Sequence, residues 1–142
     1  MTAMANYLES SLIQHLFRTG TFTKPTVVAI ALCTSAPTDA STGATIPEVS
    51  DAGSYARYAL NPLDANWANV TAGDGTTNNV GAATFTTATG DWGTISHVAI
   101  LDNTTHGAGN LFFWGALTAS KVVGSGDTFQ FSAAQLTIRI DD

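Results

Sequence analysis

The chain has 142 residues, enough for one domain with its own hydrophobic core, and we expect residues 1–142 to form a single domain. Its formal net charge is −6 and its few basic residues are scattered, so we expect no nucleic-acid partner. No polybasic segment or stretch of about 20 apolar residues points to a membrane. Only 11% of the residues are charged, which favours a neutral surface of the kind that copies or partners cover.

The first predicted element is an amphipathic helix over residues 6–19. Its apolar side chains, which recur with a helical period, are Leu8, Leu12, Ile13, Leu16 and Phe17. Asn6 with Glu9 three residues later resembles a capping box, and Gly20 is placed to end the helix. A single helix cannot bury such a stripe alone, so it must dock on the sheet or on a neighbouring subunit.

A strand is predicted next, over residues 26–34, and both of its faces are apolar, as in a strand buried on both sides. The lone Cys33 lies within it and cannot form an intrachain disulfide, so we interpret it as a small buried hydrophobe and not as a reactive thiol. Residues 35–53 form a long polar segment. It is either a contact loop for a partner or a disordered surface loop.

The rest of the chain is a series of short apolar segments separated by turn residues. The strands we expect cover residues 54–60, 82–87, 94–101, 111–117, 121–123, 129–131 and 136–140. No strand–helix–strand alternation occurs, which argues against a parallel sheet. The sequence therefore predicts a mainly β protein, an antiparallel β-sandwich of jelly-roll-like type, with one N-terminal amphipathic helix.

Residue types that perform chemistry are sparse and dispersed. His15, His97 and His106 are far apart and belong to no zinc or catalytic motif. Residues 74–79 carry oxygen atoms that calcium could use, but they lack EF-hand spacing, and ordinary turn chemistry is favoured. The acidic residues fall in predicted loops, turns and the helix. We therefore expect no catalytic residue, no metal and no cofactor, and a protein that is not an enzyme.

The three tryptophans, Trp67, Trp92 and Trp114, allow two interpretations. They could line a shelf for a glycan, or they could anchor the core or a subunit interface. Aromatic residues in a β-sandwich more often serve the second purpose, which we favour.

Four segments together resemble a family of small tailed-bacteriophage virion proteins. They are TVVAIALCTSAPTD (residues 26–39), EVSDAGSYARYAL (48–60), DWGTISHVAILD (91–102) and NLFFWGALTASKVVGSGDTFQFSAAQLTIRID (110–141). Members of the family are often labelled tail fibre proteins, and others of similar size and architecture look like capsid decoration (cement) proteins, which sit as trimers on the head. No member resembles an enzyme.

The resemblance implies a structural protein of the virion, made in the host cytoplasm. We expect a capsid decoration protein that bridges capsomers as a homotrimer, with the major capsid protein or other virion proteins as partners. The alternative is a tail-fibre or tail-associated host-binding module. The residues we expect at the assembly interface are Leu12, Leu16, Tyr55, Arg57, Trp92 and Trp114. For Arg57, whose guanidinium suits bidentate contacts, an intrachain salt bridge is the open alternative.

Overall fold

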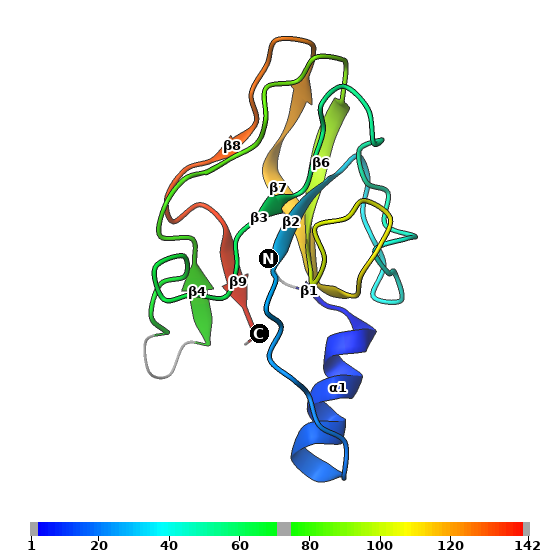
Figure 1. The fold of residues 1–142 in the computed structure, drawn as a ribbon, viewed down its shortest axis with the longest axis vertical. Coiled ribbons are helices and arrows are strands. Elements are labelled where there is room, and N and C mark those ends of the chain that lie inside the picture. The colour runs from blue at the N-terminus through cyan, green and yellow to red at the C-terminus, as the bar shows by residue number, and fades with distance from the viewer. Residues whose placement is uncertain (1–2, 71–74, 141–142) are drawn as a thin grey trace.

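A five-stranded antiparallel sheet forms the centre of the molecule in the computed structural model, which describes residues 3–70 and 75–140 (Figure 1). Its strand order is β1–β7–β6–β2–β3. The strands are β1 (Ala3–Met4), β2 (Ala29–Cys33), β3 (Tyr58–Ala59), β6 (Gly93–Leu101) and β7 (Leu111–Val123). The mainly β, antiparallel architecture that the sequence predicts is thus confirmed, as is the helix near the N-terminus.

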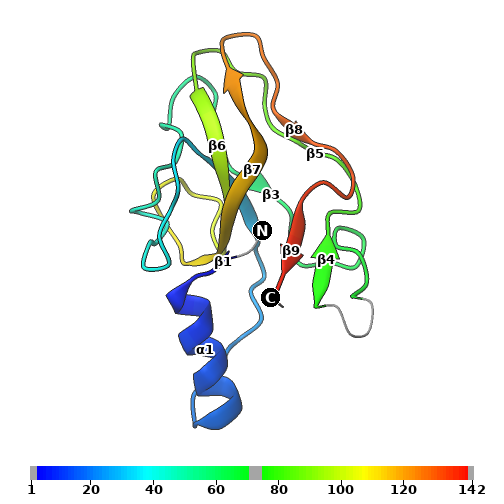
Figure 2. The same cartoon turned by 180° about the vertical axis from the view of Figure 1, so that it is seen from behind.

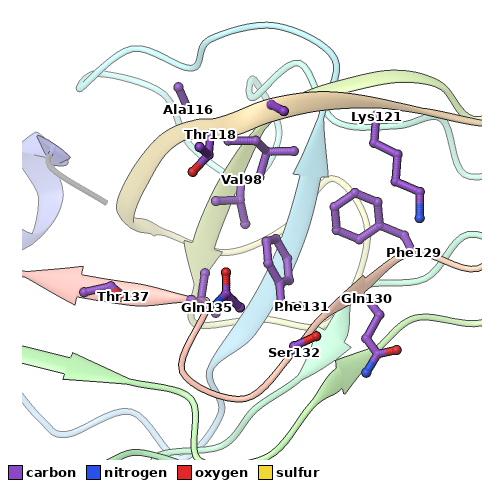
Figure 3. A pocket seen from close by; sticks show the side chains of 13 residues that line it. Val98, Ala116, Thr118, Lys121, Phe129, Gln130, Phe131, Ser132, Gln135 and Thr137 are labelled. Carbon is purple, nitrogen blue, oxygen red and sulfur yellow. The ribbon is translucent and has the colours of Figure 1, made fainter.

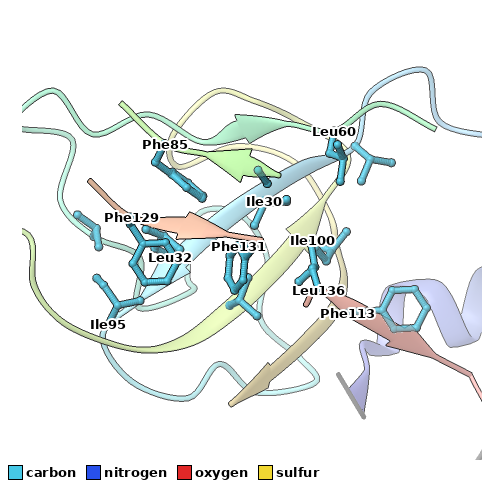
Figure 4. Close-up of a cluster of buried hydrophobic side chains, with 14 of the residues drawn as sticks. Ile30, Leu32, Leu60, Phe85, Ile95, Ile100, Phe113, Phe129, Phe131 and Leu136 are labelled. Carbon is cyan, nitrogen blue, oxygen red and sulfur yellow. The ribbon is translucent and has the colours of Figure 1, made fainter. Parts of the chain in front are cut away.

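Two short antiparallel strand pairs make a second layer beside this sheet (Figure 2). The pairs are β4 (Thr76–Asn78) with β9 (Thr137–Arg139), and β5 (Ala83–Thr84) with β8 (Gln130–Phe131). The larger hydrophobic core contains buried side chains from both layers, including Ile30, Ile95 and Phe131 (Figure 4). Phe129 and Phe131, two residues apart on the same face of the chain, both enter this core.

Strand β2 is buried along its whole length, which confirms the prediction from its two apolar faces. Ile30 and Leu32 point into the larger core cluster. Ala31 and Cys33 point to the other side, into a smaller cluster that also contains Leu111. The sheet is therefore covered on both faces near β2 even though it is antiparallel.

Helix α1 (Asn6–Phe17) lies where the sequence predicts it, but its start differs in detail. The N-cap residue is Ala5, which has no side-chain cap, so the predicted capping box is wrong. The Ala5 carbonyl instead accepts hydrogen bonds from the amides of Leu8 and Glu9. Gly20 lies beyond the C-cap, and a Cβ there would come within 2.8 Å of the Gln14 Cβ, so close approach of the returning chain explains this glycine.

The predicted strand over residues 54–60 is mostly absent. Only Tyr58–Ala59 forms a strand, and the expected start of the strand is a turn in which Gly53 and Ser54 both adopt positive φ angles, 60° and 62°. Strand β7 is longer than predicted and joins the two segments expected at 111–117 and 121–123. No helix within residues 3–70 and 75–140 has the length and apolar character needed to cross a membrane.

Candidate functional site

Helix α1 projects from the β body (Figure 1). Its apolar stripe becomes more exposed toward the C-terminal end of the helix. Leu8, at the base, is 6% exposed, and Leu12 is half-buried against the larger core cluster. Leu16, one turn further along the same stripe, is 67% exposed, and the neighbouring Phe17 is 76% exposed. The body of the molecule thus covers the first half of the stripe and leaves the second half uncovered.

The returning chain holds this projection at its last turn and at its base. The Phe22 amide donates a hydrogen bond to His15 Nδ1 (3.2 Å). The Phe22 ring packs edge-on against Phe112 of β7, and the Tyr7 ring stacks on the same phenylalanine. Because the base is fixed in this way, α1 presents Leu16 and its apolar neighbours in a defined direction. Leu12 and Leu16, two of the predicted interface residues, therefore lie on the projecting element.

Arg57 is buried and uses all five of its N–H donors inside the chain. Its Nε donates to Glu48 Oε1 (2.8 Å) and its Nη2 donates to Glu48 Oε2 (2.7 Å). The remaining donors reach the carbonyl oxygens of Asn103, Ala108 and Gly43. A guanidinium saturated in this way has no donor left for another subunit. Of the two interpretations of Arg57, the intrachain salt bridge is therefore the one in the structure, and the predicted interface role is wrong.

Tyr55 belongs to the same network. Its hydroxyl donates to Glu48 Oε1 (2.9 Å) and accepts a hydrogen bond from the Leu32 amide (2.9 Å). Burial, with the nearby Glu48 charge adding to it, raises the pKa of the Tyr55 phenol far above its ordinary value. Tyr55 is thus a core residue, and its predicted place at an interface is corrected. The same two causes raise the pKa of the Cys33 thiol to about 12, which agrees with its interpretation as a buried hydrophobe.

The polar segment at residues 35–53 is attached to the body through its second half. The Thr34 amide bonds to the Pro47 carbonyl, and the Val49 amide bonds to Leu32 of β2. Ile46 and Val49 are buried in the two core clusters. The second half of this segment is therefore neither a disordered loop nor an arm free to reach a partner. Its apolar side chains are buried in the core clusters, and Glu48 is paired within the chain.

Each tryptophan N–H is bonded within the chain. Trp92 is buried, and its Nε1 donates to the Gly53 carbonyl (2.9 Å), so its predicted role at an interface gives way to one in the core. Trp67 Nε1 donates to the Leu60 carbonyl (3.1 Å). Trp114 Nε1 donates to Asp39 Oδ1 (2.9 Å), and its half-buried ring packs on the smaller core cluster. These separate attachments do not form a common shelf for a glycan, and only Trp67 and Trp114 keep exposed ring surface.

The described residues contain no group of three or more His, Cys, Asp or Glu side chains that could hold a metal ion. The calcium site considered at residues 74–79 includes Asp74, which lies outside the described residues. Asn79 is fully buried and gives its amide hydrogens to the Gly81 and Ser132 carbonyls. Its Oδ1 accepts from the Leu136 amide (2.8 Å). Asn79 therefore stabilises a turn and has no oxygen free for a cation.

A groove that the sequence analysis missed lies between β7 and residues 129–137 (Figure 3). Its volume is about 590 Å³. Val98, Phe131 and Leu136 give it an apolar floor, and small or polar side chains, such as Thr118 and Gln130, line its rim. The sequence signal for it is the run of small residues in GALTAS (residues 115–120), which interrupts the apolar pattern of β7.

A family model described as Podophage GP4 fiber I protein gp80 matches residues 3–139 of the chain. The match spans the helix, the central sheet and both short strand pairs. No curated protein matches the chain.

Proposed function

The chain belongs to the Podophage GP4 fiber I protein gp80 family, and we propose that it is a homotrimeric, fibre-associated protein that acts by assembly and not by catalysis. The family match bears out the resemblance to small tailed-phage virion proteins that carry the tail fibre label. A structural role in a phage virion follows from membership of this family. The trimer, the position in the virion and the absence of catalysis are parts of the proposal.

The observation that carries the proposal is the uncovered half of the α1 stripe. Ile13, Leu16 and Phe17 are large apolar side chains on a projecting helix, where water is a poor environment for them. A helix of 12 residues is marginal in water without tertiary packing, so the projecting half gains stability from a partner. A second and third copy offer the same stripe, and three copies around one axis can cover one another's apolar tips.

The proposal that the protein is not an enzyme is supported by how its most reactive interior groups are used. Glu48, Tyr55 and Arg57 satisfy one another and nearby main-chain carbonyls. The raised pKa values of Tyr55 and Cys33 keep both groups protonated at neutral pH, where neither is an activated nucleophile. These residues are suited to fixing loops in place.

Capsid decoration is the second candidate function. It is supported by the low charge of the chain, in which only 11% of residues are charged, because a protein that clamps capsomers buries much of its surface. This function requires binding to assembled heads and not to free coat subunits. The fibre function requires attachment to the tail or to a fibre.

An electron-microscopy map of the intact virion tests these functions. The fibre function predicts density for the β body, with its projecting helix, in a tail-associated fibre. Density at three-fold positions on the head would contradict the fibre function and support the decoration function. Absence of the protein from purified particles, measured by mass spectrometry against the major capsid protein, would contradict both.

A further inference from the structure

We propose that the groove between β7 and residues 129–137 binds an extended segment of a different virion protein, which adds to β7 as a further strand. The inference rests on the proposed role in virion assembly and names the surface through which the protein is attached. It is carried by the hydrogen-bonding edge of β7, by the opposite wall at β8, and by the apolar floor and charge of the groove.

Strand β7 has an unpaired stretch beside the groove. In its register with β6, Ala116 lies opposite His97 and Lys121 lies opposite Ile95, so residues 117–120 face Ser96 alone. On the other edge of β7, β1 pairs only with Phe113 and Trp114 among the described residues. Beyond Trp114 this other edge of β7 has no strand partner among the described residues, and an exposed strand edge is a ready template for another strand.

The opposite wall of the groove offers a second edge. The Phe85 amide donates to the Phe129 carbonyl (2.9 Å), so Phe129 bonds toward β5. Bonding directions alternate along an antiparallel strand, which turns the main chain of Gln130 away from β5. Gln130 also lines the groove. A strand lying there would have β7 on one side and β8 on the other, and would join the two layers of the body.

The free edge of β7 and the apolar floor of the groove favour an extended chain. An α-helix with its side chains is about 10–12 Å across, whereas neighbouring strands lie only about 4.8 Å apart. The apolar floor at Val98, Phe131 and Leu136 suits a segment with an apolar side chain at every second residue, because successive side chains of a strand point to opposite faces.

Charge and topology define the occupant further. Lys121 is the one charged residue that lines the groove within the part of the chain that the structure describes. Its Nζ lies 3.1 Å from the Thr128 carbonyl and 5.5 Å from the Phe129 ring centroid. An acidic residue in the bound segment would complement it. Strands β1 and β9 are already paired within the chain, with β7 and β4, so the first and last strands of a second copy are not the donors we infer.

The test compares two substitutions at one position on the free edge. Ala119→Pro removes a main-chain N–H and hinders strand addition, while Ala119→Thr adds side-chain bulk and keeps the N–H. Ala119 is absent from the strand registers, so we expect both purified variants to melt at the wild-type temperature. Phages that carry Ala119→Pro should contain at least about tenfold less of the protein per particle, equivalent to about 1.4 kcal/mol of attachment. The Ala119→Thr phages should retain it.

A photo-crosslinking amino acid in place of Thr118, which lines the groove, identifies the occupant in purified virions. This experiment tests the proposal independently if Ala119→Pro fails to fold. Crosslinks to an extended segment of a different virion protein support the proposal. Wild-type incorporation of folded Ala119→Pro, crosslinks only to a second copy of this chain, or no crosslink at all would overturn it. Absence of the wild-type protein from particles would instead contradict the proposed function itself, so the two failures are distinguishable.

Discussion

Arg57 and Glu48 form a buried two-point ion pair, with Nη2 and Oε2 2.7 Å apart and side chains 0% and 3% exposed. The same guanidinium bonds to carbonyls at Gly43, Asn103 and Ala108. One side chain therefore connects two loops that are distant in the sequence. The pair fixes the polar segment at residues 35–53 against the body of the protein.

Replacing Arg57 should destabilise the fold strongly. Arg57→Met leaves the Glu48 carboxylate buried without its counter-charge and leaves three carbonyls without their donor, and we expect a loss of about 3–5 kcal/mol in the free energy of unfolding. Urea denaturation followed by circular dichroism measures it. Lys24→Met removes an exposed positive charge and should change the stability by less than about 0.5 kcal/mol. Equal effects of the two substitutions would mean that the ion pair does not hold the loops.

Cys33 should resist alkylation in the folded protein. Its side chain is fully buried and its pKa is raised from 9.0 to about 12, so the thiolate is scarce at pH 8. Iodoacetamide should modify Cys33 only after unfolding in guanidinium, as read by intact mass. Between pH 9 and 12 the unfolded chain loses the thiol proton before the folded chain does, so this group should lower stability as pH rises. Rapid labelling of the native protein at pH 8 would contradict the burial.

Asn79 should be a stability determinant of the second layer. Asn79→Ala removes two donors and one acceptor that connect residue 79 to Gly81, Ser132 and Leu136, and unsatisfied buried groups cost about 1–3 kcal/mol each. We expect a clear fall in the melting temperature. Asn6→Ala is the matched control: Asn6 is exposed and does not cap α1, so its loss should be nearly neutral. A larger fall in melting temperature for Asn6→Ala than for Asn79→Ala would indicate that Asn6 caps α1, contrary to the structure.

The sequence predicts those elements in which local pattern and tertiary burial agree. The stripe from Leu8 to Leu16 reveals α1, and the apolar faces around Ile30 and Leu32 reveal β2. The predicted interface at Tyr55 and Arg57 failed for a tertiary reason. Their partners include Glu48 and carbonyls more than 40 positions away, and a short sequence window shows an alternating strand there instead.

Two further features were outside the reach of sequence patterns. Strand β4 consists of polar residues that lack hydrophobic alternation, and it forms through its pairing with β9. The irregular stretch of β7 at residues 117–120 depends on the register of β7 against β6, which local sequence does not specify. For this reason the groove beside β7 could not be found before the structure, although its run of small residues was visible.

The assembly function predicts that the exposed tip of α1 holds copies together. The double substitution Leu16→Lys with Phe17→Lys places two charges on the apolar tip and should separate the subunits, since like charges and lost burial both oppose association. Gln14→Lys adds a charge to an exposed polar position of the same helix and should leave the assembly intact. Circular dichroism should show an unchanged β body in both variants.

Sedimentation equilibrium of the purified protein measures whether the tip of α1 holds three copies together. We expect a wild-type mass three times that of the 14.7 kDa chain, and a single-chain mass for the Leu16→Lys, Phe17→Lys variant. The Gln14→Lys control should sediment like the wild type. A wild-type protein that stays a single chain at every concentration, or a double variant that keeps the wild-type mass, would contradict this expectation.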